Sequence, residues 1–348
     1  MTTVLTPWVT PAICLLQTRV RRPTCRMFAS LLAALAILCV VPPARSQAYP
    51  GKQPIRLVVP FAPGTGSDLL ARLLTPRLTE LLGQNVIVDN RPGGGSIVAT
   101  EAVAKAAPDG YTLLLGTNAQ FVIGPAVYGN KLRYRPDTDF VALGSVARTP
   151  MVLVTSMSDS APKNLAEFIQ RVRAAPANFS STGSGAFGHL VGELLVYRLG
   201  AKATHIPYRG SAQSLTDVST GEILFAMDSP AAAASLLRAS KLRALAITGT
   251  ERSGSMRDVP TLEEAGVKGM NVFAWFGVFG PAGLPAEVTQ RLRNEVARTV
   301  RESELHQRLS TLSLEPYMTT PEQFERTMRD DLPFWQKFVQ DAAIQISQ

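Results

Sequence analysis

Two glycine-rich segments have the composition of an anion-binding site, and each lies directly before a predicted helix. The first segment follows an apolar run at 55–60. Its candidate ligand-binding residues are Phe61, Ala62, Pro63, Gly64, Thr65, Ser67 and Asp68. Glycine lets the backbone approach a ligand, and the start of a helix offers unpaired N–H groups with a partial positive charge. We therefore predict a carboxylate site here, with Ser67 and Asp68 also capping the helix.

The second glycine-rich segment lies further along the chain, in a separate series of predicted strands and helices. Its candidate ligand-binding residues are Thr182, Gly183, Ser184, Gly185 and Ala186. With Gly188, the glycines match the G-x-G-x-x-G spacing of dinucleotide sites. Such a site also needs an apolar strand in front and an acid about 20 residues later. Residues 178–181 are polar and 203–208 contain no acid, so the pattern favours a small anion.

Three more residues are predicted to contact the rest of the ligand, namely Asn118, Tyr208 and Asp228. Asn118 follows a predicted strand at 111–116. Asp228 ends another strand, where a carboxylate suits an ammonium or hydroxyl group of a ligand. Alternatively, Asp228 caps the helix that starts near Ser229, and both interpretations stay open.

The sequence offers little for catalysis. The serine of the G-x-S-x-G hydrolase motif is missing, and the three histidines lack zinc-ligand spacing. Ser184 and His189 resemble a nucleophile and base, but no orienting acid is visible, and we expect His189 to pack or hydrogen-bond locally. We predict no catalytic residue, no metal site and no cofactor.

The elements around these sites alternate between strand and helix. Apolar runs at 55–60, 86–88 and 111–116 enclose helical patterns at 68–82 and 97–106, and a second series begins at 151. This order predicts parallel sheets covered on both faces. The chain has 348 residues, about twice a typical domain, which agrees with two α/β domains. A capping box at Thr320–Gln323 predicts the start of the last helix.

The first 48 residues read as a secretory signal. Arginines up to Arg26 precede an uncharged apolar run from Met27 to Val41, and small residues follow up to Ala48. A membrane-spanning helix needs about 20 apolar residues, so the run is short for that role. We predict cleavage after Ala48 and export to the periplasm, with a permanent anchor as the alternative.

The net charge of +8 does not indicate nucleic-acid binding. Five of the 35 basic residues, but no acidic one, precede Tyr49, which leaves a net charge of +3 for the rest. All three cysteines also precede Tyr49, so the remaining chain has no thiol for catalysis, metal binding or disulfides. Arginines at 291–301 alternate with acids, as on a solvated helix face. We predict no nucleic-acid partner.

A set of ordered motifs resembles the Bug family of solute-binding proteins, which belong to tripartite tricarboxylate transporters. The resemblance covers essentially the whole chain after the signal, in the family's order. The motifs are Ile55–Gly64, Asp89–Gly93, Pro108–Leu114, Thr182–Gly185 with His189-Leu190, Ile206–Gly210, Lys241–Ala246, Trp275–Gly277 and Gly280–Gly283. The chain departs from the family at Thr65, where relatives have a second consecutive glycine, and this leaves the finer ligand geometry open.

The resemblance implies a type II periplasmic binding protein fold. In that α/β fold, two domains are joined by two crossing strands and enclose an interdomain ligand cleft. The expected domain 1 covers 49–150 and 275–348, and domain 2 covers 151–274. In this family two glycine loops grip a ligand carboxylate, partly through ordered water. On this chain the two loops are 61–68 and 182–186.

The resemblance also implies a function without catalysis. We expect a periplasmic receptor that captures a small organic carboxylate, closes around it and delivers it to the membrane permease subunits of a transporter. A monomer is the default expectation. The alternative is a periplasmic sensor module that presents the bound carboxylate to a signalling partner.

Overall fold

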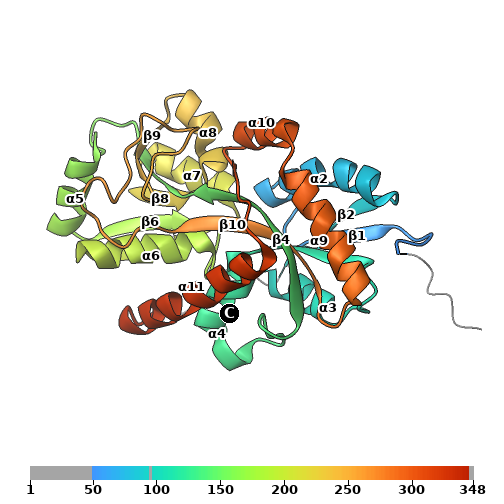
Figure 1. The fold of residues 1–348 in the computed structure, drawn as a ribbon. Helices are drawn as coiled ribbons and strands as arrows, with labels where there is room; N and C mark the ends of the chain where they lie inside the picture. Colours follow the sequence, from blue (N-terminus) through green and yellow to red (C-terminus); the bar gives the residue numbers. More distant parts are fainter. Residues whose placement is uncertain (1–48, 94–95, 345–348) are drawn as a thin grey trace, which may run out of the picture. The chain divides into compact units, whose positions relative to one another are not determined.

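The structure is a computed structural model that describes residues 49–93 and 96–344 (Figure 1). The predicted signal sequence at 1–48, with its apolar run and cleavage site, lies outside the described residues. Among the helices that are described, none combines the length and apolar character needed to cross a bilayer.

The first sheet has six strands in the order β11-β4-β10-β3-β1-β2. The strands are β1 (Ile55–Val59), β2 (Val86–Asn90), β3 (Thr112–Thr117), β4 (Phe140–Pro150), β10 (Phe273–Pro281) and β11 (Glu315–Pro316). Strands β1, β2 and β3 are parallel, as predicted. The parallel arrangement holds for these three strands but not for the full sheet, because β10 inserts between β3 and β4 and runs antiparallel to both.

The second sheet has five strands in the order β7-β6-β8-β5-β9. The strands are β5 (Val152–Ser156), β6 (Ala177–Ser181), β7 (Ala203–Pro207), β8 (Phe225–Asp228) and β9 (Leu242–Ile247). Strands β6, β7 and β8 are parallel, whereas β5 is antiparallel to β8 and β9. Residues 178–181 form part of β6 although most of them are polar. Their burial against neighbouring strands outweighs their weak strand pattern.

Helices pack against both sheets. The helices are α2 (Gly66–Leu82), α3 (Ile97–Ala104), α4 (Gly124–Tyr128), α5 (Leu165–Ala174), α6 (Phe187–Leu199), α7 (Ser211–Thr220), α8 (Pro230–Arg238), α9 (Ala286–Val300), α10 (Ser303–Thr311) and α11 (Pro321–Asp341). Helices α2 and α3 lie where the apolar patterns at 68–82 and 97–106 predict them. A short π-helical segment, Ala119–Ile123, precedes α4. The capping box of α11 is confirmed, with Thr320 and Gln323 bonding each other's backbone N–H groups.

In both sheets, the carboxyl ends of the parallel strands lie at the edge nearest the point where β4 leads into β5. Because β10 is antiparallel to β3 and β4, these two strands end at one edge, where Phe273 of β10 pairs with Pro150. The chain then passes straight into β5, whose Val152 pairs with Asp228 at the end of β8. The loops that follow β1 and β6 therefore leave their sheets toward this shared junction. Figure 1 shows the antiparallel strands β4 and β10 side by side. The predicted domain limits stay a prediction.

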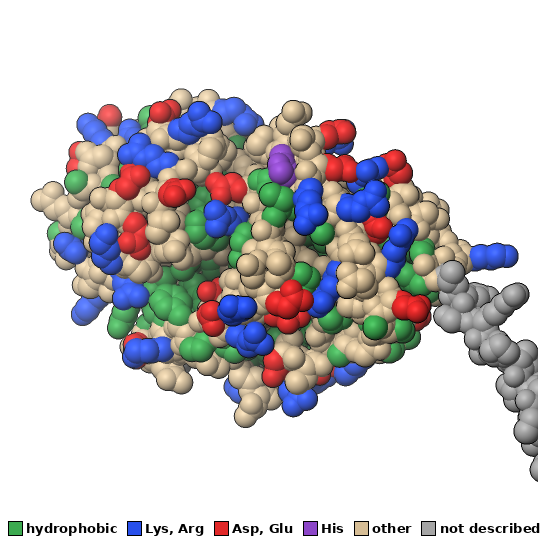
Figure 2. All heavy atoms as spheres, in the orientation of Figure 1, with side chains coloured by type: hydrophobic (Ala, Val, Ile, Leu, Met, Phe, Trp, Pro, Cys, Tyr) green, Lys and Arg blue, Asp and Glu red, His purple; other side chains and the backbone are tan. Residues whose placement is uncertain are grey.

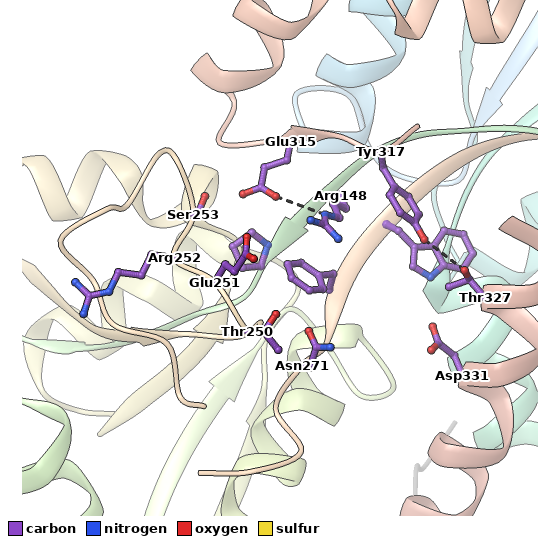
Figure 3. Close-up of a pocket in the computed structure, with 13 residues that line it drawn as sticks. Arg148, Thr250, Glu251, Arg252, Ser253, Asn271, Glu315, Tyr317, Thr327 and Asp331 are labelled. Carbon is purple, nitrogen blue, oxygen red and sulfur yellow. Dashed lines mark hydrogen bonds and ion pairs between the residues drawn. The ribbon is translucent and has the colours of Figure 1, made fainter. Parts of the chain in front are cut away.

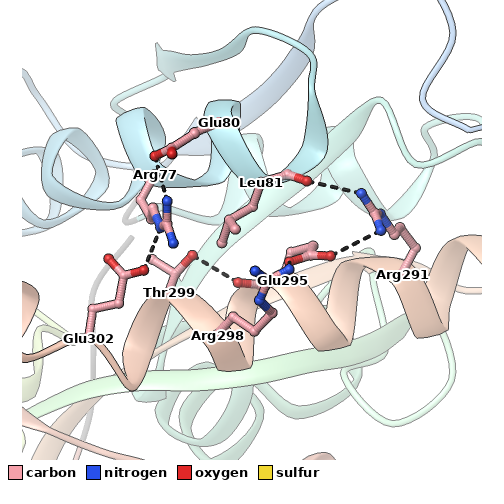
Figure 4. Close-up of polar contacts among 8 residues, drawn as sticks. All are labelled: Arg77, Glu80, Leu81, Arg291, Glu295, Arg298, Thr299 and Glu302. Atoms are coloured by element: carbon pink, nitrogen blue, oxygen red, sulfur yellow. Dashed lines mark hydrogen bonds and ion pairs between the residues drawn. The ribbon is translucent and has the colours of Figure 1, made fainter.

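Helix α2, which carries the first glycine loop at its start, is tied to α9 by charged groups (Figure 4). Arg77 pairs with Glu302, just beyond α9. Arg291 of α9 donates from Nη2 to the carbonyl oxygen of Leu81 at 3.0 Å and pairs with the buried Glu295 at 3.2 Å. These contacts fix the direction in which α2 begins, and so fix the loop before it.

Over the face seen in Figure 2, basic and acidic side chains are interspersed, without a continuous region of one sign. This mixture is typical of a solvated surface.

Candidate functional site

The first glycine loop ends in a helix cap made by Thr65. The Thr65 hydroxyl accepts from the Asp68 amide at 3.4 Å and donates to the Ala62 carbonyl oxygen at 2.8 Å. The expectation that Ser67 and Asp68 form the cap is therefore corrected, because α2 begins at Gly66. Among the described residues, the amide N–H groups of Gly66 and Ser67 make no hydrogen bond. Two donors at the positive end of α2 stay available.

The buried carboxylate of Asp68 holds this loop in place. It accepts from the Gly64 amide at 2.9 Å and pairs with Arg72 at 3.0 Å. Burial of the carboxyl group opposes ionisation. The hydrogen bonds from Arg72 and Gly64 outweigh it and hold the pKa of Asp68 below its ordinary value. Gly64 has a φ of 82°, a conformation that favours glycine and points its N–H at Asp68. The contact of Asp68 with a ligand stays a prediction.

The second glycine loop follows β6 and leads into α6 without a side-chain cap. The N-cap residue is Ala186, and the amide N–H groups of Phe187, Gly188 and His189 make no hydrogen bond within the described residues. Thr182 and Ser184 are exposed, so their hydroxyls face solvent. This helix start therefore leaves more amide donors open than that of α2 does, and the binding of an anion there stays a prediction.

The histidines beneath this loop serve structure. His189 accepts from the Gly185 amide through Nδ1 at 3.1 Å, and its ring stacks on His205 at 3.7 Å. Burial, with a contribution from His189, lowers the pKa of His205 to about 3, so the pair is held together without a charge on His205. Among the described residues, no hydrogen bond joins Ser184 to His189, and the structure does not assemble a nucleophile and base here.

Asn118 and Tyr208 lie at the predicted edges, but each makes a bond to the protein itself. Asn118 follows β3 and donates from Nδ2 to the Phe273 carbonyl oxygen at 3.1 Å, which ties β3 to the start of β10. The Tyr208 hydroxyl donates to Asp217 at 2.5 Å, and this bond, together with burial, raises the pKa of Tyr208 to about 12. Their contacts with a ligand stay predictions, and the Asp217 partner was not predicted from the residue pattern.

Asp228 lies at the end of β8, between the starts of α7 and α8. Its Oδ1 accepts from the Ser229 amide at 2.7 Å, while its Oδ2 is buried without a hydrogen-bond partner. Ser229 provides the side-chain cap of α8, so Asp228 is not that cap. Burial raises the pKa of Asp228 to about 6, against the lowering effect of Ser211 and Ser229. An unpaired oxygen at the carboxyl edge of the second sheet suits a hydroxyl or ammonium of a ligand.

Replacing Asp228 with asparagine is expected to stabilise the ligand-free protein at neutral pH. The folded-state pKa of about 6 exceeds the ordinary 3.8, so the folded state binds the proton more tightly. The free energy of unfolding therefore falls as the pH rises from 3.8 to 6, and the full penalty applies above pH 6. Asp228→Asn removes it and should gain on the order of 2 kcal/mol at pH 7.5. Near pH 4 the gain should vanish.

Urea denaturation of both proteins at pH 7.5 and pH 4 measures this difference. The exposed Asp159→Asn provides the matched control for the change of charge. An equal gain at both pH values would contradict the assignment of the penalty to the ionised carboxylate.

The structure thus places the candidate site residues at one edge of each sheet, and the two edges meet where β4 leads into β5. The loop at 61–68 and Asn118 follow β1 and β3. The loop at 182–186 follows β6, Tyr208 follows β7, and Asp228 is the last residue of β8. Ligands of α/β sheets commonly bind outside the carboxyl ends of parallel strands. Four of the cavities among the described residues have volumes of about 370 to 520 Å³, and neither loop lines any of these four. The described residues include no group of three metal-ligating side chains.

Comparison with known proteins shows the same architecture. A family model described as tripartite tricarboxylate transporter family receptor matches residues 70–344. BugT of Bordetella pertussis is 30% identical and aligns with 92% of this chain and 98% of its own. The solved structure of Rpa4515 from R. palustris with adipate has a TM-score of 0.78 and 33% identity, covering 85% of this chain and 99% of that one. MatC from Rhodopseudomonas palustris with bound malate has a TM-score of 0.73 and 31% identity, covering 84% and 100%.

These matches confirm the resemblance to the Bug proteins and the fold class that it implied. Two separate mixed sheets with covering helices are shared with the solved relatives, and two of those relatives hold carboxylates. The chain therefore belongs to the tripartite tricarboxylate transporter receptor family, a family of periplasmic solute-binding proteins that includes the Bug proteins.

Proposed function

We propose that this protein is an extracytoplasmic receptor that captures a small organic carboxylate between the loops at 61–68 and 182–186. The observation that carries the proposal is the pair of helix starts, α2 and α6, whose open amide N–H groups lie at sheet edges turned toward one junction. Charge-assisted bonds from such donors to a carboxylate are strong where water is excluded. Adipate and malate in the solved relatives support this ligand class.

Domain closure is part of the proposal. The two loops begin helices that belong to different sheets, so the complete site would form when the 49–150/275–348 and 151–274 domains close on the ligand. The strands β4 and β10 would act as the hinge. The closed receptor would then deliver its ligand as a monomer to membrane permease subunits, after export by the signal at 1–48. The family description supports that partner.

A carboxylate is expected to raise the unfolding temperature, and Ser184→Trp is expected to abolish the rise. Ligand at about 100 times its dissociation constant stabilises a protein by about 2.7 kcal/mol. The indole would fill the space in front of the open amides of α6, whereas Ser184 itself is exposed and its replacement should not disturb the core. A thermal-shift screen over adipate, malate and further mono-, di- and tricarboxylates identifies the ligand for this test.

Ser160→Trp places the same side chain at another exposed serine of the same predicted domain and should keep the full rise. The assignment of the loop at 182–186 to the ligand would be wrong if Ser184→Trp responded to the ligand like the unmodified protein. A screen in which no carboxylate raised the unfolding temperature would refute the ligand class itself.

A further inference from the structure

A cavity of about 370 Å³ lies beside the crossing strands, apart from both glycine loops (Figure 3). Its walls come from β4, β10, β11 and α11, and from the 250–253 segment that follows β9. None of the residues assigned above to the carboxylate site lines it. The volume falls within the range of small-molecule sites, about 300–1,000 Å³.

Two buried N–H donors in this cavity have no hydrogen-bond partner. One is the indole Nε1 of Trp275, a side chain that is only 3% exposed. The other is Nε of Arg148, which forms an ion pair with Glu315 at 3.5 Å but makes no hydrogen bond to it. Buried donors in native proteins almost always bond to an acceptor. Two unpaired donors in one cavity therefore call for an acceptor from a bound molecule.

Aromatic rings also line this cavity. The Arg148 guanidinium lies over the Phe273 ring at 4.5 Å and over the Tyr317 ring at 5.7 Å, measured to the ring centroids. Trp275 and Tyr317 both pack on Phe324, which holds their rings in place. Aromatic faces attract organic cations as well as guanidinium groups.

The negative charges of the cavity outnumber its available positive ones. Arg148 is already paired with Glu315. Arg252 pairs with Glu264 at 2.9 Å, and Figure 3 shows its side chain pointing away from the other labelled residues. Glu251 and Asp331 have no ion pair among the described residues. A ligand cation would complete the charge balance.

Asp331 reaches the same cavity from α11. Burial raises its pKa to about 6, and the indole N–H of Trp275, which faces this carboxyl group, acts in the other direction. At pH 7.5 the carboxyl group is therefore mostly ionised, with an unpaired donor beside it. A ligand with both an acceptor and a cation would satisfy the two groups together.

We propose that this cavity is a second ligand site, for a small zwitterion that carries one carboxylate and one ammonium group. The carboxylate accepts from the N–H groups of Arg148 and Trp275. The ammonium lies near Asp331, against the aromatic wall. The proposal is independent of the carboxylate site between the glycine loops.

The indole N–H of Trp275 reports on this site directly. After the predicted cleavage the chain from Tyr49 on has two tryptophans, Trp275 and Trp335, so a nitrogen-15 correlation spectrum has two indole signals, and Trp275→Phe identifies the one that belongs to Trp275. If that variant does not fold, Trp335→Phe identifies the signal by elimination. The probes are glycine, β-alanine, γ-aminobutyrate and glycine betaine, with an equimolar mixture of acetate and ethylammonium as the control for unlinked charges.

At pH 7.5 we expect at least one zwitterion to shift the Trp275 signal saturably, and the control mixture to leave it in place. Glycine betaine separates recognition by aromatic faces from recognition by ammonium hydrogen bonds. Asp331→Asn should weaken binding about tenfold through loss of the charge partner. Asp330→Asn, an exposed neighbour on the same helix, should leave the affinity unchanged. Ser184→Trp should leave it unchanged as well.

Two results would overturn the proposal. If every probe left the Trp275 signal unmoved at tens of millimolar, the two donors would be satisfied by water and the cavity would hold no zwitterion. If Asp331→Asn bound the probe as tightly as the unmodified protein, the ammonium would not lie in this cavity. A shift that disappears in Ser184→Trp would place the binding at the loop site instead and equally reject a second site.

Discussion

Gly188→Ala is expected to lower the unfolding temperature and to remove carboxylate binding together. Gly188 is the second residue of α6, and a Cβ atom there would lie 2.4 Å from the backbone carbonyl oxygen of Met227 in β8. No carbon approaches a backbone oxygen so closely, so the start of α6 must move away from the sheet. Forced overpacking of this kind costs about 1–3 kcal/mol, and occasionally more.

The loss of binding has the same cause. The open amides of Phe187, Gly188 and His189 are the donors that we assign to the ligand, and a shift of the helix start redirects all three. Displacements of this size matter because hydrogen bonds weaken steeply with angle and distance. Isothermal titration with the carboxylate found in the screen, and thermal denaturation of the ligand-free protein, measure the two effects separately.

Gly254→Ala is the matched control, because a Cβ atom there meets no atom within 4 Å and its φ lies outside the left-handed region. It should change stability by no more than about 0.5 kcal/mol and leave binding intact. Normal affinity in Gly188→Ala would show that the position of α6 against β8 does not set the ligand donors.

The site segments could be predicted from the sequence because their chemistry is local. A strand followed by glycines and then by an apolar helical pattern specifies a loop at the carboxyl end of that strand, as at 61–68. Thr65 also follows the general preference for hydroxyl side chains at the N-cap of a helix. The resemblance to the family points only to the extra side chain that Thr65 carries where relatives have glycine. Local signals therefore placed both loops, but not their internal bonds.

The two crossing strands were not predicted as strands from the residue pattern, for a physical reason. Strand β4 is buried along nearly its whole length and shows no alternation. Strand β10 contains glycines that resemble turn signals, yet Gly277 provides room for a neighbouring ring. A Cβ atom there would lie 2.3 Å from Phe324. The need for that glycine comes from α11, about 50 residues away in the chain, and no local pattern contains it.

Contacts between distant segments were equally invisible. The Tyr208–Asp217 bond depends on how a loop and α7 meet, and the cavity beside β4 depends on five segments that converge only in the folded chain. Neither the bond nor the cavity can be predicted from residue types alone. No local pattern links Trp275 to Asp331, and only the fold shows that they lie at one cavity.

Phe324→Ala is expected to cause the largest loss of stability among the variants considered, about 3–5 kcal/mol. Phe324 is fully buried in the first turns of α11 and packs on Trp275 at 4.9 Å, Phe279 at 5.6 Å and Tyr317 at 6.1 Å between ring centroids. Because Gly277 leaves no side chain to fill the space, the truncation creates a cavity at the centre of this aromatic cluster. Urea denaturation should show a lower midpoint with an unchanged slope.

Phe334→Ala removes the same side chain from the same helix at a half-buried position and should cost clearly less. Hydrogen exchange of the α11 amides provides a second measurement, because loss of the Phe324 anchor should speed exchange in α11 before it does so in α2, which is tied to α9 by separate contacts. Equal losses for the two phenylalanines would mean that α11 is held by its other contacts, such as Trp335 with Phe187, rather than by the cluster on β10.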